Sequence, residues 1–162
     1  MAGKECQPLD PIDRKILNLL QSHPEMPLAQ ISERVSLSQT PCWRRVKRLE
    51  TDGVIRGRAV LLDPAALGLG VSVFVNLKLR QHDELTLEKL ERAACDRPEI
   101  VECFCTSGEI DYILRVVTKS IEAYEQFLKK VLLHFPGIGS VESSFTLKCV
   151  KWTTRLPIDS ID

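Results

Sequence analysis

The sequence lacks a long apolar run and an apolar leader, and both absences limit the class of protein. No stretch of about eighteen consecutive apolar residues occurs, so no membrane-spanning helix is expected. The first residues, MAGKECQP, lack the apolar core that a signal peptide requires, so we expect a cytoplasmic protein. Net charge is also lacking, because 22 Lys and Arg balance 22 Asp and Glu. A generally basic surface is therefore excluded.

Cysteine is present, but without the spacing of a metal site. Six cysteines occur, yet none forms a C-x-x-C pair, and no histidine lies at zinc-ligand spacing from them. In a reducing compartment such thiols act as small apolar groups, so we expect neither a metal ion nor a cofactor. Cys103 and Cys105 share one face of a predicted strand. A redox or metal role for this pair stays open as the alternative.

The first fifty residues show helical periodicity in three segments. Asp10 to Leu20 carries apolar residues on one face, and Pro24 ends this first helix. A second, shorter helix follows Pro27, and residues 36–38 connect it tightly to a third. Two helices joined by a short turn, the second of them basic, predict a helix-turn-helix at about residues 28–50.

The third helix is the most informative segment, with the sequence LSQTPCWRRVKRLE over residues 37–50. Ser38 and Thr40 offer hydroxyls to the unpaired backbone amides of its first turn, where Pro41 is also well tolerated. The buried stripe is Cys42, Val46 and Leu49, while the Arg and Lys side chains point elsewhere. A helix with short polar groups at its start and clustered basic residues suits the DNA major groove.

A basic wing is predicted after this helix, which Gly53 ends. Residues 54–62 are rich in aliphatic side chains and carry Arg56 and Arg58, so they predict a short hairpin. Six Lys and Arg face two Asp and Glu between Ser38 and Arg58. In a neutral chain this local excess indicates a patch for a partner, although an ordinary solvated face is the alternative. The candidate DNA contacts are Ser38, Gln39, Thr40, Pro41, Trp43, Arg44, Arg45, Lys47, Arg48, Arg56 and Arg58.

The second half changes to strand periodicity and predicts a separate domain. Strands are expected at 71–79, 100–106, 112–117 and 141–152, with helices at 85–97 and 120–134. This β-α-β-β-α-β order is the ferredoxin-like arrangement, with both helices on one face of an antiparallel sheet. Two helices cannot cover all its apolar residues, so we expect a sheet-to-sheet homodimer. The apolar residues that two helices cannot all bury are Val71, Val73, Val75, Phe104, Ile113, Phe145 and Leu147.

The expected organisation is therefore an α+β chain with two domains. A winged helix-turn-helix occupies residues 1–64, with the wing at 54–62, and residues 65–70 form a linker. Residues 71–162 form the ferredoxin-like domain. The turn between its two middle strands places Glu109 and Asp111 beside hydroxyls and backbone amides, which suits both charges of an amino acid. The candidate effector contacts are Thr106, Ser107, Gly108, Glu109, Ile110, Asp111 and Tyr112, and a solvated polar turn is the alternative.

From Leu9 to about Ile158 the chain resembles the Lrp/AsnC (leucine-responsive, feast/famine) family of transcription factors. The matching motifs are LDxxDRxIL from residue 9, SxTPCxRRVxxLE from 38, GVI from 53, LLDP from 61, SGEIDYIL from 107 and FPGI from 135. The family carries Asp in many members where this chain has Glu109. Trp43 resembles the Thr-Pro-Cys-Trp form of members that respond to cysteine.

The resemblance implies a bacterial or archaeal, nucleoid-associated regulator of amino-acid metabolism. Its helix-turn-helix would bind double-stranded DNA at a pseudo-palindromic operator. Its second domain would bind an amino-acid effector between subunits near Gly108 to Tyr112. Homodimers would assemble further, commonly into octamers.

Two other classes remain as rivals. An enzyme would use Glu109 and Asp111 as an acid–base pair, but no nucleophile, metal cluster or phosphate loop accompanies them, so we expect no enzyme. The other rival is an amino-acid-sensing module without operator binding, against which the basic third helix argues.

Overall fold

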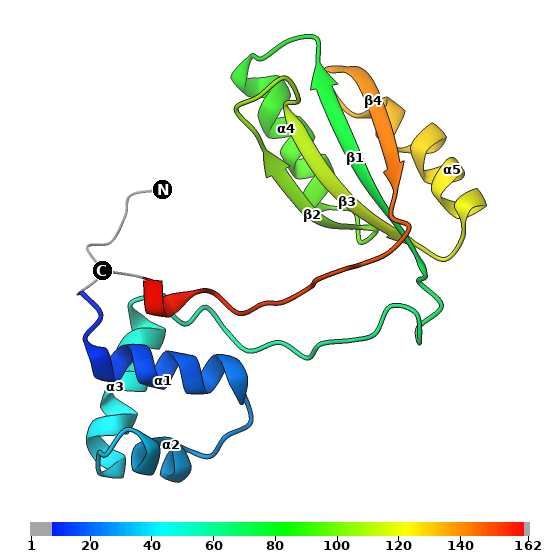
Figure 1. Ribbon diagram of the computed structural model, residues 1–162. Helices are drawn as coiled ribbons and strands as arrows, with labels where there is room; N and C mark the ends of the chain where they lie inside the picture. Colours follow the sequence, from blue (N-terminus) through cyan, green and yellow to red (C-terminus); the bar gives the residue numbers. More distant parts are fainter. Residues whose placement is uncertain (1–7, 161–162) are drawn as a thin grey trace. The chain divides into compact units, whose positions relative to one another are not determined.

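The computed structural model describes residues 8–160 (Figure 1). Residues 1–7 lie outside this range. They include Cys6 and the segment in which no signal peptide is expected. The chain divides into two compact units, one formed by residues 1–61 with 151–162 and the other by residues 62–150. No helix in residues 8–160 is both long and apolar enough to cross a bilayer.

Three α-helices build the first unit, as the periodicity predicts. They are α1 (Pro11–Ser22), α2 (Leu28–Arg34) and α3 (Gln39–Thr51). Ser36, which has φ 57°, makes the sharp turn between α2 and α3. The apolar stripes of the helices meet in one core, so their burial against each other holds this small unit together. The fully or nearly buried apolar residues of this core are Ile16, Leu17, Ile31, Val35, Cys42, Val46, Leu49 and Ile158.

The caps of α1 and α3 differ from each other. Asp10 accepts a hydrogen bond from the backbone N–H of Asp13 (2.8 Å), and the Asp13 carboxylate accepts one from the N–H of Asp10 (3.3 Å). This reciprocal pair is a capping box, which stabilises the start of α1. Ser38 occupies the N-cap of α3, but its side chain makes no capping hydrogen bond. The prediction that the Ser38 hydroxyl caps this helix is therefore wrong.

The predicted wing hairpin at residues 54–62 is wrong, since the structure forms no strand in that segment. Gly53 does end α3 as expected, with φ +77°. Beyond it, Gly57 divides the segment into short arms, and the apolar residues of the second arm, residues 60–62, are consecutive instead of alternating. Such an arm cannot place its apolar side chains on one face, and Val60 stays 85% exposed.

The end of the chain belongs to the first unit and not to the ferredoxin-like domain. The expected last strand, 141–152, instead runs as β4 (Ile138–Phe145), and a short 3-10 turn, η2 (Ile158–Ser160), follows an extended segment. Gln21 on α1 accepts from the backbone N–H of Leu156 (2.6 Å) and donates to its carbonyl (3.2 Å). Ile158 is buried in the helical core. The domain boundary expected at residue 162 therefore lies near residue 150.

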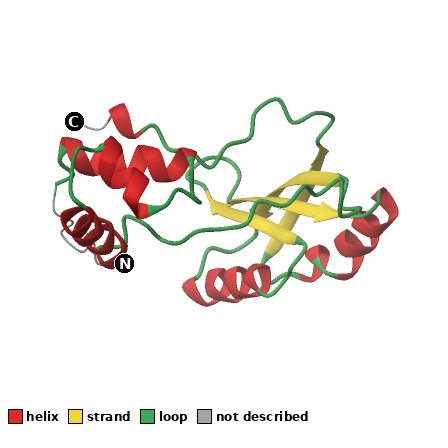
Figure 2. Cartoon of the chain, turned by 90° about the horizontal axis from the view of Figure 1, so that it is seen from below, coloured by secondary structure: helices red, strands yellow, loops and turns green. Residues whose placement is uncertain are grey.

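The second unit confirms the β-α-β-β-α-β order. Its other elements are β1 (Val71–Leu79), α4 (Glu84–Cys95), β2 (Ile100–Cys105), β3 (Tyr112–Thr118), α5 (Ile121–Lys130) and the 3-10 turn η1 (Leu132–His134). The four strands form an antiparallel sheet in the order β2-β3-β1-β4. Both helices cover the same face of this sheet (Figure 2).

The two faces of the sheet differ in burial. Val73, Val75 and Leu77 lie fully buried in the core cluster that also includes residues of α4 and α5. The helices thus bury Val73 and Val75, and Val71 packs against the same core, whereas Phe104 and Leu147 stay exposed, so the expectation that two helices cannot bury the whole predicted set is confirmed. Phe145 also faces the helices, since its ring meets Tyr124 edge-on at 5.3 Å between centroids. The open face retains Phe74, Phe104 and Ile113, while Leu147 lies beyond the end of β4.

Candidate nucleic-acid interface and effector loop

The outer surface of α3 presents most of the predicted DNA contacts to solvent. Cys42, Val46 and Leu49 are buried, as the helical spacing predicts. The residues of the predicted set that are exposed on or before this helix are Ser38, Gln39, Thr40, Pro41, Trp43, Arg44 and Lys47. The first turns of α3 therefore form a polar surface with two exposed cations, of the kind that contacts base edges in a helix-turn-helix.

Arg45 and Arg48 take a different direction, toward the start of α1. Arg45 Nη1 lies 2.5 Å from Asp10 Oδ2 and 2.9 Å from Asp13 Oδ1. Arg48 pairs with the second oxygen of Asp13, whose side chain is completely buried. A buried carboxylate requires such partners, because an uncompensated charge inside a protein is strongly destabilising. These two arginines therefore hold α3 against α1.

The charge state of this network follows from its hydrogen bonds. The N–H of Asp13 and the guanidinium of Arg45 lower the pKa of the Asp10 carboxyl. The same carboxylates raise the pKa of Arg45. Asp10 and Arg45 therefore form an ion pair at neutral pH, and the charge of Arg45 is compensated within the unit.

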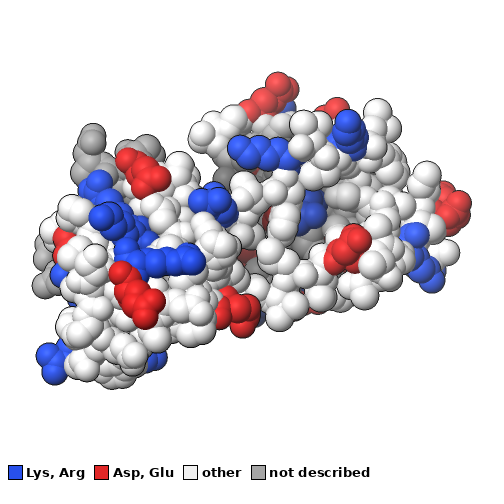
Figure 3. Space-filling model, turned by 60° about the horizontal axis from the view of Figure 1, so that its bottom comes forward, with Lys and Arg blue, Asp and Glu red and all other residues white. Residues whose placement is uncertain are grey.

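The cations left for a partner are fewer than the sequence count implies. Lys47 forms an exposed ion pair with Glu50 (2.7 Å), which contributes little to stability and can be exchanged for a partner. In the described part of the chain, Arg44, Arg56 and Arg58 form no ion pair within 4.0 Å, whereas Arg45 and Arg48 do. Basic side chains gather over the first unit, with acidic ones at their borders (Figure 3).

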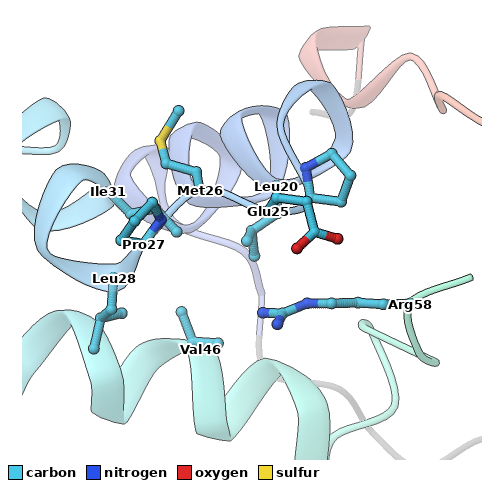
Figure 4. Close-up of a pocket in the computed structure, with 9 residues that line it drawn as sticks. Leu20, Glu25, Met26, Pro27, Leu28, Ile31, Val46 and Arg58 are labelled. Atoms are coloured by element: carbon cyan, nitrogen blue, oxygen red, sulfur yellow. The ribbon is translucent and has the colours of Figure 1, made fainter. Parts of the chain in front are cut away.

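A cavity of ≈ 310 Å³ lies beside this surface, and the sequence did not indicate it. Arg58 reaches toward it from the segment after α3, and Glu25 lies across from the guanidinium (Figure 4). The lining residues are Leu20, Pro24, Glu25, Met26, Pro27, Leu28, Ile31, Val46 and Arg58. Arg58 therefore lines a cavity of the helical unit, although the predicted wing that contains it does not form.

The predicted effector loop connects β2 to β3 and is fastened by Asp111. The backbone N–H of Leu79 donates to Asp111 Oδ2 (2.7 Å), and His82 Nε2 lies 2.8 Å from Oδ1. These two hydrogen bonds, with the Leu79 amide first, lower the pKa of Asp111. The carboxylate is thus used to hold the loop against the end of β1. His82 was missed in the sequence, where the only signal is its position just after the strand that pairs with Tyr112.

Two more residues of the loop have internal partners. Tyr112 is buried, its hydroxyl donates to Glu91 (2.7 Å), and burial raises the pKa of the phenol. The Thr106 hydroxyl donates to the carbonyl of Ile110. In contrast, the Glu109 side chain is 87% exposed and lies 3.6 Å from Lys78, a neighbour that the sequence did not reveal. Ser107, Gly108 and Glu109 are therefore the residues that the loop presents outward.

The cysteines do not gather into a metal site in the described residues, which contain no metal-binding group of three or more His, Cys, Asp or Glu. Cys103 and Cys105 share one face of β2, as predicted, because they pair with the buried Leu114 and Tyr112. Burial raises the pKa of the Cys103 thiol. A protonated thiol is a poor nucleophile, so the raised pKa does not favour a redox role for Cys103.

Two family models match the chain, one in the first unit and one mainly in the second. The model described as winged helix-turn-helix DNA-binding matches residues 9–56. The model described as Lrp/AsnC ligand binding domain matches residues 72–156. Together with the fold, they define a DNA-binding transcriptional regulator with a ligand-binding domain.

Named relatives agree over nearly the whole length. The DNA-binding transcriptional activator DecR of Escherichia coli is 40% identical over 151 residues, covering 93% of this chain and 99% of that protein. The leucine-responsive regulatory protein of Escherichia coli is 38% identical over 150 residues, covering 93% and 92%. The chain therefore belongs to the Lrp/AsnC family of transcriptional regulators, which are not enzymes.

Solved structures support the same fold. An AsnC family transcriptional regulator from Agrobacterium tumefaciens superimposes with a TM-score of 0.87 at 41% identity, covering 93% of this chain and 98% of that one. A transcriptional regulator from Neisseria meningitidis, solved as a complex with L-Met, gives a TM-score of 0.88 at 37% identity, covering 94% and 98%.

Proposed function

We propose that this protein regulates genes of amino-acid metabolism by binding a pseudo-palindromic operator under the control of an amino acid. The observation that carries the proposal is the outer surface of α3, where polar residues and cations are exposed to solvent. The opposite side of the helix is attached to α1 through the ion pair of Arg45 with Asp13. Arg44, Lys47, Arg56 and Arg58 would contact phosphates. Ser38, Gln39 and Thr40 would approach base edges.

The open face of the sheet supports a two-fold homodimer. Phe74 and Phe104 are exposed there, and exposed apolar surface of this kind favours association with a second copy. A homodimer would present two α3 helices roughly 34 Å apart, matching half-sites about one DNA turn apart. Dimers would assemble further, with an octamer as the proposed form. We place such a regulator in the cytoplasm, at the nucleoid.

The effector would bind at the outward part of the β2–β3 loop. Glu109 is the exposed carboxylate that can accept hydrogen bonds from an ammonium group, while Ser107 and the loop amides can donate to a carboxylate. The relative solved with L-Met supports an amino acid as the class of effector. Binding would alter operator affinity only through its different affinity for the two states of the assembly, typically about 1–3 kcal/mol.

A gel-shift titration tests both parts. The probe is duplex DNA from upstream of the gene that encodes this chain, titrated alone and with each of the twenty amino acids. We expect specific, salt-sensitive binding that one amino acid changes, and the Glu109→Gln variant should retain binding but lose that change. Specific binding that no amino acid alters would contradict the effector assignment. Absence of specific binding would instead favour the sensing module that does not bind an operator.

A further inference from the structure

Trp43 is an exception among the apolar residues of the three helices α1, α2 and α3. On α1, α2 and α3 it is the one large apolar side chain that the described structure leaves exposed, with 50% of its surface accessible. The other large apolar residues of these helices belong to the helical core or pack against it. Helix packing therefore does not explain why a tryptophan occupies this position.

The position of Trp43 is on the surface that is proposed to meet DNA. Gln39, Trp43 and Lys47 follow one another at four-residue intervals, so they form one row along the helix. Trp43 lies in the second turn of α3, next to the exposed Arg44. Arg45, by contrast, is directed to Asp10 and Asp13. The indole thus stands among groups that would approach the major groove.

The chemistry of an indole selects what it can contact there. It has no charge for a phosphate and a single N–H donor, so its main surface is a flat apolar ring. The only apolar group that a base pair presents in the major groove is the C5-methyl of thymine. An exposed ring in this place gains by burying that methyl, and cytosine, which lacks it, would leave the ring exposed or wet.

We propose that Trp43 is a specificity-determining residue that recognises the methyl group of one thymine in each operator half-site. This inference rests on the proposed function, since it requires α3 to enter the major groove. It goes further by naming a base and the group on it that is read. Operators of this protein should therefore carry a thymine at one fixed position of each half-site.

Deoxyuridine provides the test, because it pairs as thymine does and lacks only the methyl. The probe is a duplex selected by the full-length protein from a random 30-base-pair pool by repeated gel shift, and then synthesised with each thymine replaced in turn. Wild-type protein should lose about three- to fivefold in affinity at one thymine per half-site, the usual effect of one buried methyl group. Other replacements should have no effect.

Variants then assign the effect to Trp43. Trp43→Ala should bind the thymine duplex more weakly and show no difference between thymine and uracil. Lys47→Ala is the matched control in the same row, and it should weaken binding to both duplexes equally while retaining the methyl effect. Trp43→Phe keeps an aromatic ring and should retain part of the effect, so the test stands even if the alanine variant fails to fold.

Two results would overturn the inference while leaving operator binding intact. One is a wild-type protein that binds specifically but is indifferent to every single deoxyuridine. The other is a Trp43→Ala variant that is folded by circular dichroism and as sensitive to the methyl as wild type. Failure of the wild-type protein to select any duplex would overturn the proposed function and, with it, this reading of Trp43.

Discussion

Arg45 on α3 reaches Asp13 on α1, with 2.9 Å between Nη1 and Oδ1, and the Asp13 side chain has no exposed surface. The sequence predicts that Arg45 belongs to the basic surface of the third helix. In the structure it is instead the partner of a buried carboxylate. Arg48 supplies the second partner. The basic helix has two kinds of cation, one that positions the helix and one that faces outward.

The first prediction concerns stability. Arg45→Ala should lower the free energy of unfolding of the first unit by about 1–3 kcal/mol, because Asp13 loses one of the groups that compensate its burial. The loss is limited because Arg48 remains. Arg44→Ala, which removes the same charge from an exposed neighbour without an ion pair, should change stability by less than about 0.5 kcal/mol. Urea unfolding measures both, and equal losses would contradict the division.

The second prediction concerns the salt dependence of operator binding. If Arg44 contacts a phosphate, Arg44→Ala should reduce the slope of log affinity against log salt by about two units for a dimer. Lys130→Ala, at the end of α5 in the other unit, removes the same charge and serves as control. Its slope should equal that of the wild type. A slope that Arg44→Ala leaves unchanged would remove this residue from the interface.

The third prediction concerns pH. The folded pKa of Asp111 lies below the unfolded value of 3.8, so its carboxylate stabilises the second unit. This contribution is complete above the unfolded pKa and is lost as pH falls through the folded pKa. Asp111→Asn should therefore be less stable than wild type at neutral pH, and the difference should shrink as pH falls below about 4. Chemical unfolding over a pH series measures it.

Ser107→Ala is the matched control for Asp111→Asn, since it alters an exposed neutral residue of the same loop. Its stability should follow that of the wild type at every pH. A difference between wild type and Asp111→Asn that persists unchanged in acid would mean that the charge of Asp111 does not contribute.

The fourth prediction concerns the end of the chain. Ile158→Ala should destabilise the first unit by about 2–4 kcal/mol, because it removes a buried side chain from the helical core. Leu156→Ala should cost much less, since that side chain is 72% exposed and Gln21 binds only its backbone. Thermal unfolding of the full-length variants compares them. Equal effects would show that Ile158 does not contribute to the core.

Local periodicity was sufficient for most of the elements. Alternation over residues 71–79 and four-residue spacing in α3 depend on neighbours in the chain, so β1 and α3 could be predicted closely. The face of the sheet on which Val73 and Val75 lie could not be predicted. Alternation shows that the two residues share a face, but it does not show which face the helices cover.

The candidate sites depended on contacts that are distant in sequence. The sequence pattern of a helix does not show whether an arginine faces solvent or a buried carboxylate. Asp13 could not be identified as the partner of Arg45 because it precedes Arg45 by 32 residues. Likewise, the loop that contains Asp111 was recognisable, but its attachment to Leu79 and His82 was not. Glu109 is the carboxylate of the loop that stays exposed, and its contact with an effector stays a prediction.

The return of the C-terminal segment to the first unit has a consequence for biosynthesis. The ribosome completes the second unit, residues 62–150, before it makes Ile158. The helices that read DNA therefore lack a part of their core until the sensor has been synthesised. A nascent or truncated chain that ends within the second unit would contain a first unit with an incomplete and less stable core. The order of translation therefore disfavours a fragment that binds DNA but lacks the ligand-binding domain.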